Sequence, residues 1–355
     1  MSKTIAVNAG SSTLKFKLFD MPSEDVVAEG TIERIGEKMG HAKIKYGNGQ
    51  KHEEDKPFAD HAAAVNYLLD KLIELKIVAS YDEITAVGHR IVAGGEFFKD
   101  STIIDDDVIS KIDELSEYAP LHEPAELVGI KAFRKVLPNA FAVAVFDTSF
   151  HVDMPEMNAL YSVPYDWYEK YGARKYGKSF DTSMGFTPVA GITMATRSGD
   201  VDPSLIAFMQ GKLNLSSDEM IDILNHKSGL LGISGISPDM RDILAAAEKG
   251  DERAQLALDI YVNRIVRYIG AYIAEMGGAD AIVFTAGVGE NSVPVRKMIT
   301  DKLDYFGIKI DQEKNNCHGV ERDLSADDAK IKTLLIPTNE ELMIVRDIER
   351  LKKNN

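Results

Sequence analysis

The sequence predicts an α/β fold with two domains, and three observations lead to that prediction. The chain has 355 residues, of which 45% are hydrophobic, and this is enough for two separate buried cores. Short apolar runs typical of buried strands, such as Phe141–Phe146, alternate with segments whose apolar residues recur at helical spacing, such as 60–76. The alternation returns in the second half, where Ala281–Ala286 leads through a glycine-containing segment into a helical pattern. Strands and helices that alternate in this way favour sheets flanked by helices.

The first segment, Lys3–Phe19, predicts a β-hairpin. Apolar and polar side chains alternate on both sides of a polar turn that runs from Asn8 to Thr13. The charged, glycine-containing segment 33–55 predicts a further hairpin with an exposed loop. A helix near 60–76 follows, because apolar residues from Val65 to Leu75 fall at helical spacing.

Two predicted strands run directly into charged residues. Ile84–Val87 leads through a glycine and a histidine to Arg90, and Phe141–Phe146 stops at Asp147. Ligands of open α/β sheets gather at the carboxyl ends of the strands, so this pattern is consistent with both charges pointing into one cleft. The alternative is a pair of unrelated loop charges, and residue type alone does not decide between the two.

In the second half, Ser216 and Glu219 have the spacing of a capping box, which predicts a helix to about Leu224. Apolar residues from Leu258 to Met276 predict a long helix that Gly277 closes. The chain then ends in a predicted strand, a loop and a basic helix.

The segment Gly287–Asn291 predicts a glycine loop between a strand and a helix that runs from about Pro294 to Leu303. Free backbone N–H groups and the helix dipole favour phosphate at such a place. The ordinary alternative is a tight turn that needs glycine for its geometry.

The composition of the chain disfavours some classes of binding partner. The formal net charge of -15 disfavours nucleic acid and anionic membranes, so an anionic substrate needs a local cluster of cations or a metal ion. The one cysteine, Cys317, excludes a disulfide framework and is expected to be a packed thiol. Because no stretch approaches the ~20 apolar residues of a membrane span, we expect a soluble cytoplasmic protein.

The segment Gly172–Ser179 matches the P-loop expression G-x-x-x-x-G-K-[ST]. A P-loop follows a buried strand and opens a helix, but the preceding Pro164–Tyr171 is polar and aromatic. Gly185 and Pro188 interrupt any helix that would follow. A P-loop nucleotide-binding protein is therefore the weakest of the alternatives.

The segment Val7–Lys15 resembles the opening motif of the acetate kinases, and the resemblance continues through nearly the whole chain. Further segments resemble motifs of that family in the family's order: Gly88–Gly95, Pro120–Pro124, Val145–Thr148, Asp181–Pro188, Thr196–Asp200, Ser237–Arg241, Gly287–Asn291 and Pro337–Glu341. Several independent motifs in order are far stronger evidence than one.

The resemblance implies two ribonuclease H-like α/β domains around a central cleft, as in the actin-like ATPase superfamily. An N-terminal acetokinase domain would comprise residues 1–147 plus 338–355. A C-terminal nucleotide-binding and dimerisation domain would comprise residues 148–337. The implied activity is reversible, Mg²⁺-dependent phosphoryl transfer from ATP to acetate, giving acetyl phosphate and ADP, with propionate as an alternative acceptor and a homodimer as the assembly.

Carried over by position, Arg90 and Arg197 would hold the carboxylate and the phosphoryl group in flight, a task suited to a planar, permanently charged guanidinium. Asp147 would position acetate or the metal. It would not act as a base, because a carboxylate substrate is already ionised near pH 7. His122 would belong to the substrate site.

The metal site implied by the resemblance consists of Asn8, Ser11 and Glu340. These residues carry the hard oxygen atoms that Mg²⁺ prefers. The alternative for Glu340 is a solvated acid that interacts only with the dipole of the last helix. The implied nucleotide-binding residues are Lys15, Asp239, Met240, Arg241, Gly287, Val288, Gly289, Glu290 and Asn291.

The chain departs from the family pattern between Gly177 and Lys178, where the pattern contains a further segment. That segment carries a Phe-His-Gly-Thr-Ser-His motif, whose histidine helps to stabilise the transition state, and a His-Leu-Gly-Asn-Gly phosphate turn, and neither occurs here. The second domain would lack a helix and the first two strands of its sheet, which leaves unpaired strand edges and exposed apolar surface.

Three explanations for this departure stay open: a shortened protein, an error in the sequence, or an omitted segment. We expect omission, so that Gly177 and Lys178 are not neighbours in the protein that folds. The alternative function is an impaired or non-catalytic nucleotide-binding member of the family.

Overall fold

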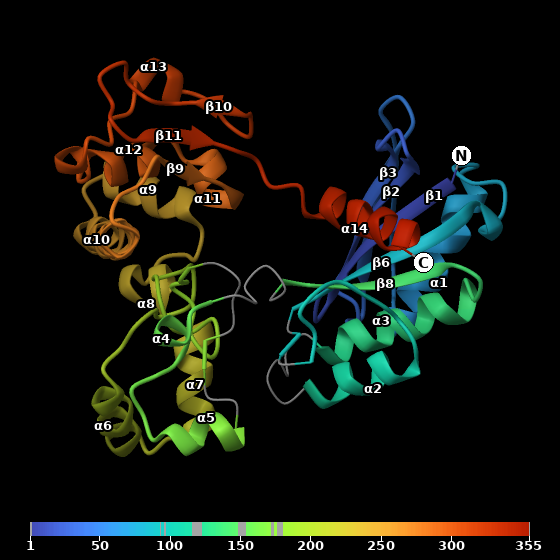
Figure 1. Ribbon diagram of the computed structural model, residues 1–355, viewed down its shortest axis with the longest axis horizontal. Coiled ribbons are helices and arrows are strands. Elements are labelled where there is room, and N and C mark those ends of the chain that lie inside the picture. Colours follow the sequence, from blue (N-terminus) through green and yellow to red (C-terminus); the bar gives the residue numbers. More distant parts are fainter. Residues whose placement is uncertain are drawn as a thin grey trace. The chain divides into compact units, whose positions relative to one another are not determined.

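The computed structural model describes residues 2–92, 94–95, 97–115, 123–147, 154–171, 174–175 and 180–354. The chain divides into two compact units (Figure 1). One unit comprises Met1–Pro155, Tyr176–Phe180 and Asn339–Asn355, and the other comprises Glu156–Lys175 and Asp181–Thr338. Each unit has its own core of buried apolar side chains.

The first unit is built on a mixed sheet of eight described strands. In spatial order they are β5 (Gln50–Lys56), β4 (Gly40–Tyr46), β3 (Asp25–Glu33), β2 (Thr13–Met21), β1 (Ser2–Ala9), β6 (Ile84–Ile91), β8 (Phe141–Phe146) and β7 (Thr102–Ile103). Strands β1 to β5 pair in sequence order and antiparallel, whereas β6 runs parallel to β1, β8 runs parallel to β6, and β7 runs antiparallel to β8. Both predicted hairpins are therefore confirmed.

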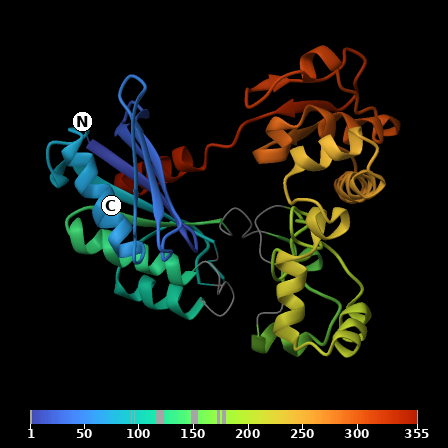
Figure 2. The same ribbon diagram turned by 180° about the vertical axis from the view of Figure 1, so that it is seen from behind.

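Helices lie on both faces of this sheet (Figures 1 and 2). One face carries α1 (His61–Glu74) and α3 (Glu123–Val136), with α2 (Asp106–Leu115) packed on α3. The other face carries α14 (Glu340–Asn354). Alternation along β1 sends Ile5 and Val7 to the α1 side and Ala6 to the α14 side. The helices predicted near 60–76 and at the end of the chain are confirmed.

Helix α14 joins the end of the chain to its beginning. Its residues Ile344, Val345 and Ile348 are at most 3% exposed and pack against alanine and valine side chains of β1, β6 and β8. Gly88 on β6 lies directly beneath the helix, where an added Cβ atom would overlap Ile344. This close approach places the first residue of α14, Glu340, beside β6.

Strand β6 is longer than the sequence predicted. The predicted strand stopped at Val87, but the strand continues to Ile91, which is fully buried. The two residues after Val87 are packed: Gly88 leaves room for α14, and the buried ring of His89 lies 5.4 Å from that of Phe133. Arg90 is thus a strand residue that pairs with Val145 of β8.

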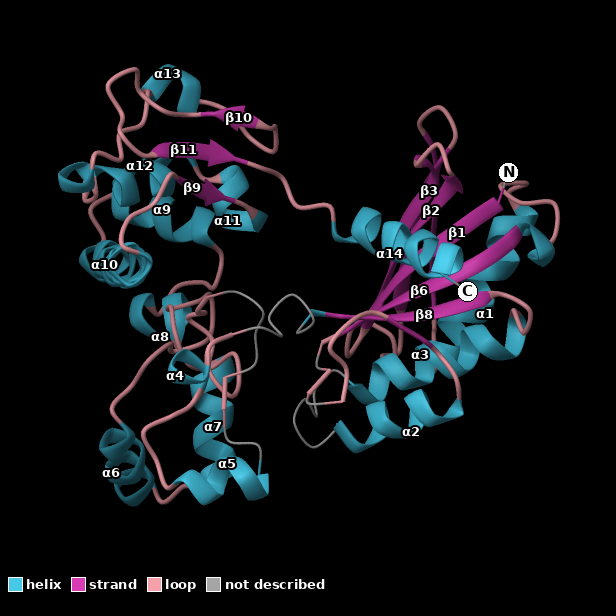
Figure 3. Cartoon of the chain, viewed as in Figure 1, coloured by secondary structure: helices cyan, strands magenta, loops and turns pink. Residues whose placement is uncertain are grey.

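The second unit is mainly helical (Figure 3). Its helices are α4 (Glu156–Ala159), α5 (Tyr165–Tyr171), α6 (Pro203–Leu213), α7 (Ser217–His226), α8 (Gly229–Ser234), α9 (Met240–Glu248), α10 (Glu252–Met276), α11 (Ala286–Asn291), α12 (Val293–Asp301) and α13 (Gln312–Asn315). Its described strands form the order β10 (Arg322–Asp323), β11 (Lys332–Leu335) and β9 (Ala281–Phe284). Single 3₁₀ turns lie at Tyr81–Glu83 in the first unit and Asp304–Phe306 in the second.

Several local signals in the second unit are confirmed. Both hydrogen bonds of the Ser216 capping box are formed at the start of α7. Gly277 ends α10 in the left-handed conformation, with φ of 71°. Cys317 is 8% exposed and packs in an apolar cluster with Leu324 and Leu335.

The predicted glycine loop at 287–291 is wrong, because this segment is the short helix α11. Glu290 closes the helical turn: its Oε1 atom accepts hydrogen bonds from the N–H groups of Ala286 and Thr338, both at 2.8 Å. The fully buried Arg296 donates to the carbonyl groups of Gly289 and Glu290. The helix predicted after the loop is confirmed as α12.

Strand β9 is the outermost described strand of its sheet, and no described strand pairs with its free edge. Val283 on this strand is 49% exposed. Such an exposed apolar edge agrees with the prediction for a second domain that lacks a segment.

The P-loop expression is preceded by helix α5, not by the strand that a P-loop requires. Residues 172–173 and 176–179 lie outside the described residues, and so does the peptide between Gly177 and Lys178. No helix in the described parts of the chain is both long and apolar enough to cross a bilayer.

We expect Gly88→Ala to destabilise the first unit by about 1–3 kcal/mol, because the new methyl group overpacks the contact with α14. The double variant Gly88→Ala/Ile344→Ala should lose less stability than the two single changes added together, since each side chain makes room for the other. Urea unfolding followed by circular dichroism measures both effects.

The matched control is Gly129→Ala on α3, where an added Cβ atom would meet Ala9 at an ordinary 3.4 Å. This change should leave stability unchanged or raise it slightly, since alanine favours helices. Strict additivity in the Gly88 and Ile344 double variant would contradict direct contact between β6 and α14.

Candidate active site

Arg90 lies at the centre of a cluster of carboxyl groups in the first unit. Its Nε and Nη2 atoms donate to the two oxygens of Asp147, at 3.0 and 2.7 Å. Its Nε atom is also 3.5 Å from Oε2 of Glu340. Strands β6 and β8 are neighbours and α14 packs across them, so three residues far apart in sequence meet at one point. The structure thus brings together two predicted substrate-binding residues and one predicted metal ligand.

Burial changes the pKa values of the carboxyl groups in this cluster. It raises the pKa of Asp147, and the nearby Glu340 carboxylate adds to the rise, whereas Arg90 lowers that pKa. The carboxyl groups of Asp147 and Glu340 both lie close to the guanidinium of Arg90. Among the contacts that the structure describes, Nη1 of Arg90 has no hydrogen-bond acceptor, so this side chain can still bind another anion.

Glu126 on α3 is a further acid whose charge acts on Arg90, and it was not predicted from the sequence. Its side chain is 3% exposed, and its Oε2 atom accepts a hydrogen bond from the N–H group of Val92 at 3.3 Å. Burial raises the pKa of Glu126 to about 8. The available signal was its spacing, because Glu126 lies four and seven residues before the buried Ile130 and Phe133, on the apolar stripe of the helix.

The turn between β1 and β2 carries the other predicted residues of the first unit. Asn8 pairs with Lys15 across the hairpin, and Ser11 is exposed at the tip of the turn. The N–H group of Gly10 donates to the carbonyl of Thr13 at 2.8 Å, which closes the turn. The geometry leaves the tip of the turn open to solvent.

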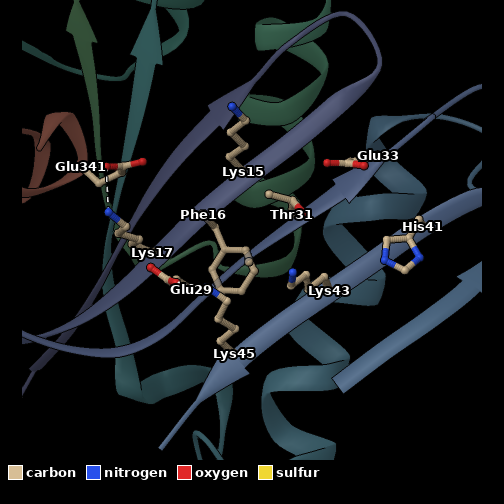
Figure 4. A pocket seen from close by; sticks show the side chains of 11 residues that line it. Lys15, Phe16, Lys17, Glu29, Thr31, Glu33, His41, Lys43, Lys45 and Glu341 are labelled. Atoms are coloured by element: carbon tan, nitrogen blue, oxygen red, sulfur yellow. Dashed lines mark hydrogen bonds and ion pairs between the residues drawn. The ribbon is translucent and has the colours of Figure 1, made fainter. Parts of the chain in front are cut away.

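A polar groove of about 490 Å³ lies beside this turn on the exposed face of β2, β3 and β4 (Figure 4). Four lysines contribute to its lining: Lys15, Lys17, Lys43 and Lys45. Lys17 forms an ion pair of 3.2 Å with Glu341, which links β2 to the start of α14. The carboxylates of Glu29, Glu33 and Glu341 line the same groove, and Glu29 pairs with Lys45 at 3.0 Å, so the groove carries charges of both signs.

The remaining predicted catalytic arginine, Arg197, lies in the second unit. Its Nη1 atom lies 3.9 Å from the sulfur of Met194, and no carboxylate pairs with it among the described residues. Its role in holding the phosphoryl group together with Arg90 stays a prediction. His122 lies outside the described residues.

The predicted nucleotide-binding residues at the start of α9 have different environments. Asp239 caps the helix and pairs with the guanidinium of Arg241, which lowers the pKa of Asp239 to about 2. Met240 is 7% exposed and its side chain belongs to the core of the second unit. In α11, Gly287 is exposed, whereas Glu290 is engaged by Ala286 and Thr338.

The raised pKa of Glu126 predicts a pH dependence of stability. Between the ordinary value of 4.5 and the folded value of about 8, the folded protein holds a proton that the unfolded chain has lost. Stability from this group therefore falls as pH rises through that window. Glu126→Gln keeps an acceptor for the Val92 N–H group but removes the titration.

We expect the melting temperature of the wild type to fall, relative to that of Glu126→Gln, as pH rises from 4.5 to about 8. Thermal melts at several pH values test this. The control Glu37→Gln, at an exposed position, should run parallel to the wild type. A Glu126→Gln curve that is also parallel would show that Glu126 does not titrate in this range.

Comparisons of both the sequence and the structure with known proteins indicate the same family. The model of the acetokinase family matches residues 3–179 and 176–346. An acetate kinase of Limosilactobacillus fermentum is 68% identical over 396 residues, covering 99% of this chain and 100% of the relative. Among solved structures, an acetate kinase of Porphyromonas gingivalis has a TM-score of 0.93 at 38% identity, covering 99% of this chain and 100% of that one. A propionate kinase of Francisella tularensis has a TM-score of 0.92 at 34% identity, covering 98% and 99%.

The family match is divided into two segments that overlap at residues 176–179, and the alignment with the Limosilactobacillus fermentum relative spans 396 positions although this chain has 355 residues. The relative therefore carries additional residues, in agreement with the departure from the family pattern found between Gly177 and Lys178. The family match and the relatives together cover nearly the whole chain. The chain belongs to the acetokinase family and has its α/β fold, that of the actin-like ATPases.

Proposed function

We propose that this chain is an acetate kinase, which transfers a phosphoryl group reversibly between ATP and acetate and so forms acetyl phosphate and ADP. The observation that carries the proposal is the partly satisfied guanidinium of Arg90, held from one side by Asp147. The high identity to proteins named acetate kinase supports the same activity. A cytoplasmic location agrees with the use of ATP as a substrate. It also agrees with the cysteine content, because the single cysteine is buried and forms no disulfide.

Arg90 would bind the carboxylate of the substrate. Asp147 occupies Nε and Nη2 and fixes the plane of the guanidinium, which leaves Nη1 to donate to a substrate oxygen. Acetate is ionised near pH 7, so its oxygen attacks the phosphorus atom without a base. Asp147 then acts by positioning Arg90, and His122 would complete the substrate site.

The phosphoryl group would be held by the turn from Asn8 to Thr13, by Lys15 and by Arg197. Phosphoryl transfer depends mostly on in-line alignment and charge neutralisation, for which backbone N–H groups and cations suffice. Arg197 has no carboxylate partner among the described residues, so its charge is available for the transferred group.

The nucleotide would be bound by Asp239, Met240, Arg241 and Gly287–Asn291. Because the Met240 side chain is buried, its contribution would come from its backbone. We propose residues 1–147 plus 338–355 as the acetokinase domain. Residues 148–337 would form the nucleotide-binding and dimerisation domain of a homodimer.

The residues proposed for Mg²⁺ fit that ion. Asn8, Ser11 and Glu340 offer an amide, a hydroxyl and a carboxylate oxygen, and the Glu340 side chain is 59% exposed. No group of three or more His, Cys, Asp or Glu that could hold a metal lies within the described ranges. This suits Mg²⁺, which keeps several waters and binds through one or two carboxylates. When bound, the ion would neutralise phosphate charge.

A second candidate function is a nucleotide-binding protein with impaired or no catalysis. It is favoured by the absence of the histidine motif and of the second phosphate turn. Preorganised donors of this kind are each worth ~10²–10³ in rate, so their joint loss should cost several powers of ten.

The test is acetyl phosphate formation by the purified 355-residue chain from ATP and acetate, with and without Mg²⁺. We expect slow, Mg²⁺-dependent turnover that rises by several powers of ten when the relative's segment is inserted between Gly177 and Lys178. ATP binding without any turnover would favour the second candidate. Turnover as fast as that of the relative would show that the missing groups are dispensable. Propionate, assayed in parallel, establishes the preferred acceptor.

A further inference from the structure

A buried histidine connects helix α1 to the turn between β1 and β2. His61, the first residue of α1, is 7% exposed, and its Nε2 atom lies 2.6 Å from the carbonyl oxygen of Gly10. A carbonyl oxygen only accepts hydrogen bonds, so Nε2 carries the hydrogen and donates it. The helix itself is capped by Asp60, which accepts from the N–H group of Ala63 at 2.8 Å. The cap therefore does not need His61.

The hydrogen bond from His61 fixes the direction of one peptide group. In a trans peptide the C=O of Gly10 and the N–H of Ser11 point in opposite directions, and this peptide is trans. Since the carbonyl of Gly10 faces His61, the N–H group of Ser11 points away from α1. Ser11 is exposed, and its N–H group has no acceptor within the described parts of the chain.

Other hydrogen bonds already hold the shape of the turn. The N–H group of Gly10 donates to the carbonyl of Thr13 at 2.8 Å, and that of Ile35 donates to the carbonyl of Ser12 at 3.0 Å. The hydrogen bond from His61 additionally fixes the orientation of one donor, the N–H group of Ser11. Lys15, which follows the turn on β2, lines the polar groove.

We propose that His61 is a positioning residue, which aims the N–H group of Ser11 at a phosphate oxygen of ATP by holding the carbonyl of Gly10. The proposal rests on the proposed function, in which this turn receives the phosphates. A donor that is already aimed binds an anion without the cost of reorienting its peptide. His61 itself does not touch the nucleotide.

The test compares two substitutions of His61 by the dissociation constant of Mg²⁺-ATP, measured by calorimetry. His61→Leu removes the donor and should raise the constant about tenfold, the effect of one hydrogen bond to a charged group. His61→Gln retains an N–H donor of similar reach and should stay within about threefold of the wild type. Acetate affinity should change in neither variant, which separates positioning of the turn from general damage.

The matched control is His52→Leu, which removes a less deeply buried histidine of the same unit, hydrogen-bonded to Tyr67 at 3.1 Å. It should leave ATP affinity unchanged. Wild-type affinity in His61→Leu would overturn the inference alone. Failure of the wild type to bind ATP would overturn the proposed function together with it.

A second measurement does not depend on the folding of His61→Leu. In the wild type, the backbone amide resonance of Ser11 should move downfield when Mg²⁺-ATP is added, because the N–H group gains an anionic acceptor. An unchanged Ser11 resonance at saturating ATP would refute the proposed role of His61.

Discussion

The docking of α14 onto the first sheet is the constraint on which the candidate site depends. Ile344, Val345 and Ile348 are almost completely buried, and side chains of this kind contribute ~1.5–3 kcal/mol each when removed from water. Ion pairs such as Arg346 with Glu24 lie at the margin of this contact and are partly exposed, so they contribute little. Apolar burial against β1, β6 and β8 therefore holds the helix, and with it Glu340, beside Arg90.

Two arginines show how the same side chain serves structure and function. Arg296 is fully buried, and all three of its nitrogen atoms donate, to an asparagine side chain and to carbonyl groups around α11 and α13. It has no donor group to spare and stabilises the local fold. Arg90 is held by Asp147 through two nitrogens only, and its Nη1 atom has no acceptor among the described residues. A fixed but incompletely satisfied cation is suited to binding a small carboxylate.

Much of the fold could be predicted from local patterns. The first hairpin, α1, β8, α7, α10 and α14 each carry a strong signal of alternation, helical spacing or capping. Sequence reasoning failed where tertiary packing overrides appearance. Gly88 and His89 end the apolar run Ile84–Val87, but they fit under α14 and against Phe133, so β6 continues through them. The glycines of 287–291 suggest a loop, yet the Glu290 and Arg296 hydrogen bonds favour a helix.

The candidate site could be predicted only in part, for a related reason. Motif resemblance identified Arg90, Asp147 and Glu340, which the structure brings together. Glu126 carried one signal, its position on the apolar stripe of α3, but that position alone does not show that the acid lies near Arg90. His61 belongs to no pattern that marks a functional residue, because its importance arises from its contact with the turn between β1 and β2.

The central claim is that the free side of Arg90 binds the carboxylate of the substrate. Titration of the chain with ¹³C-labelled acetate, followed by NMR in the presence of Mg²⁺-ADP, tests it most directly. Arg90→Gln should weaken acetate binding at least about tenfold and leave ADP binding within about twofold of the wild type, because a charge-assisted hydrogen bond is lost at one ligand only. Equal acetate affinity in a folded Arg90→Gln variant would contradict the account.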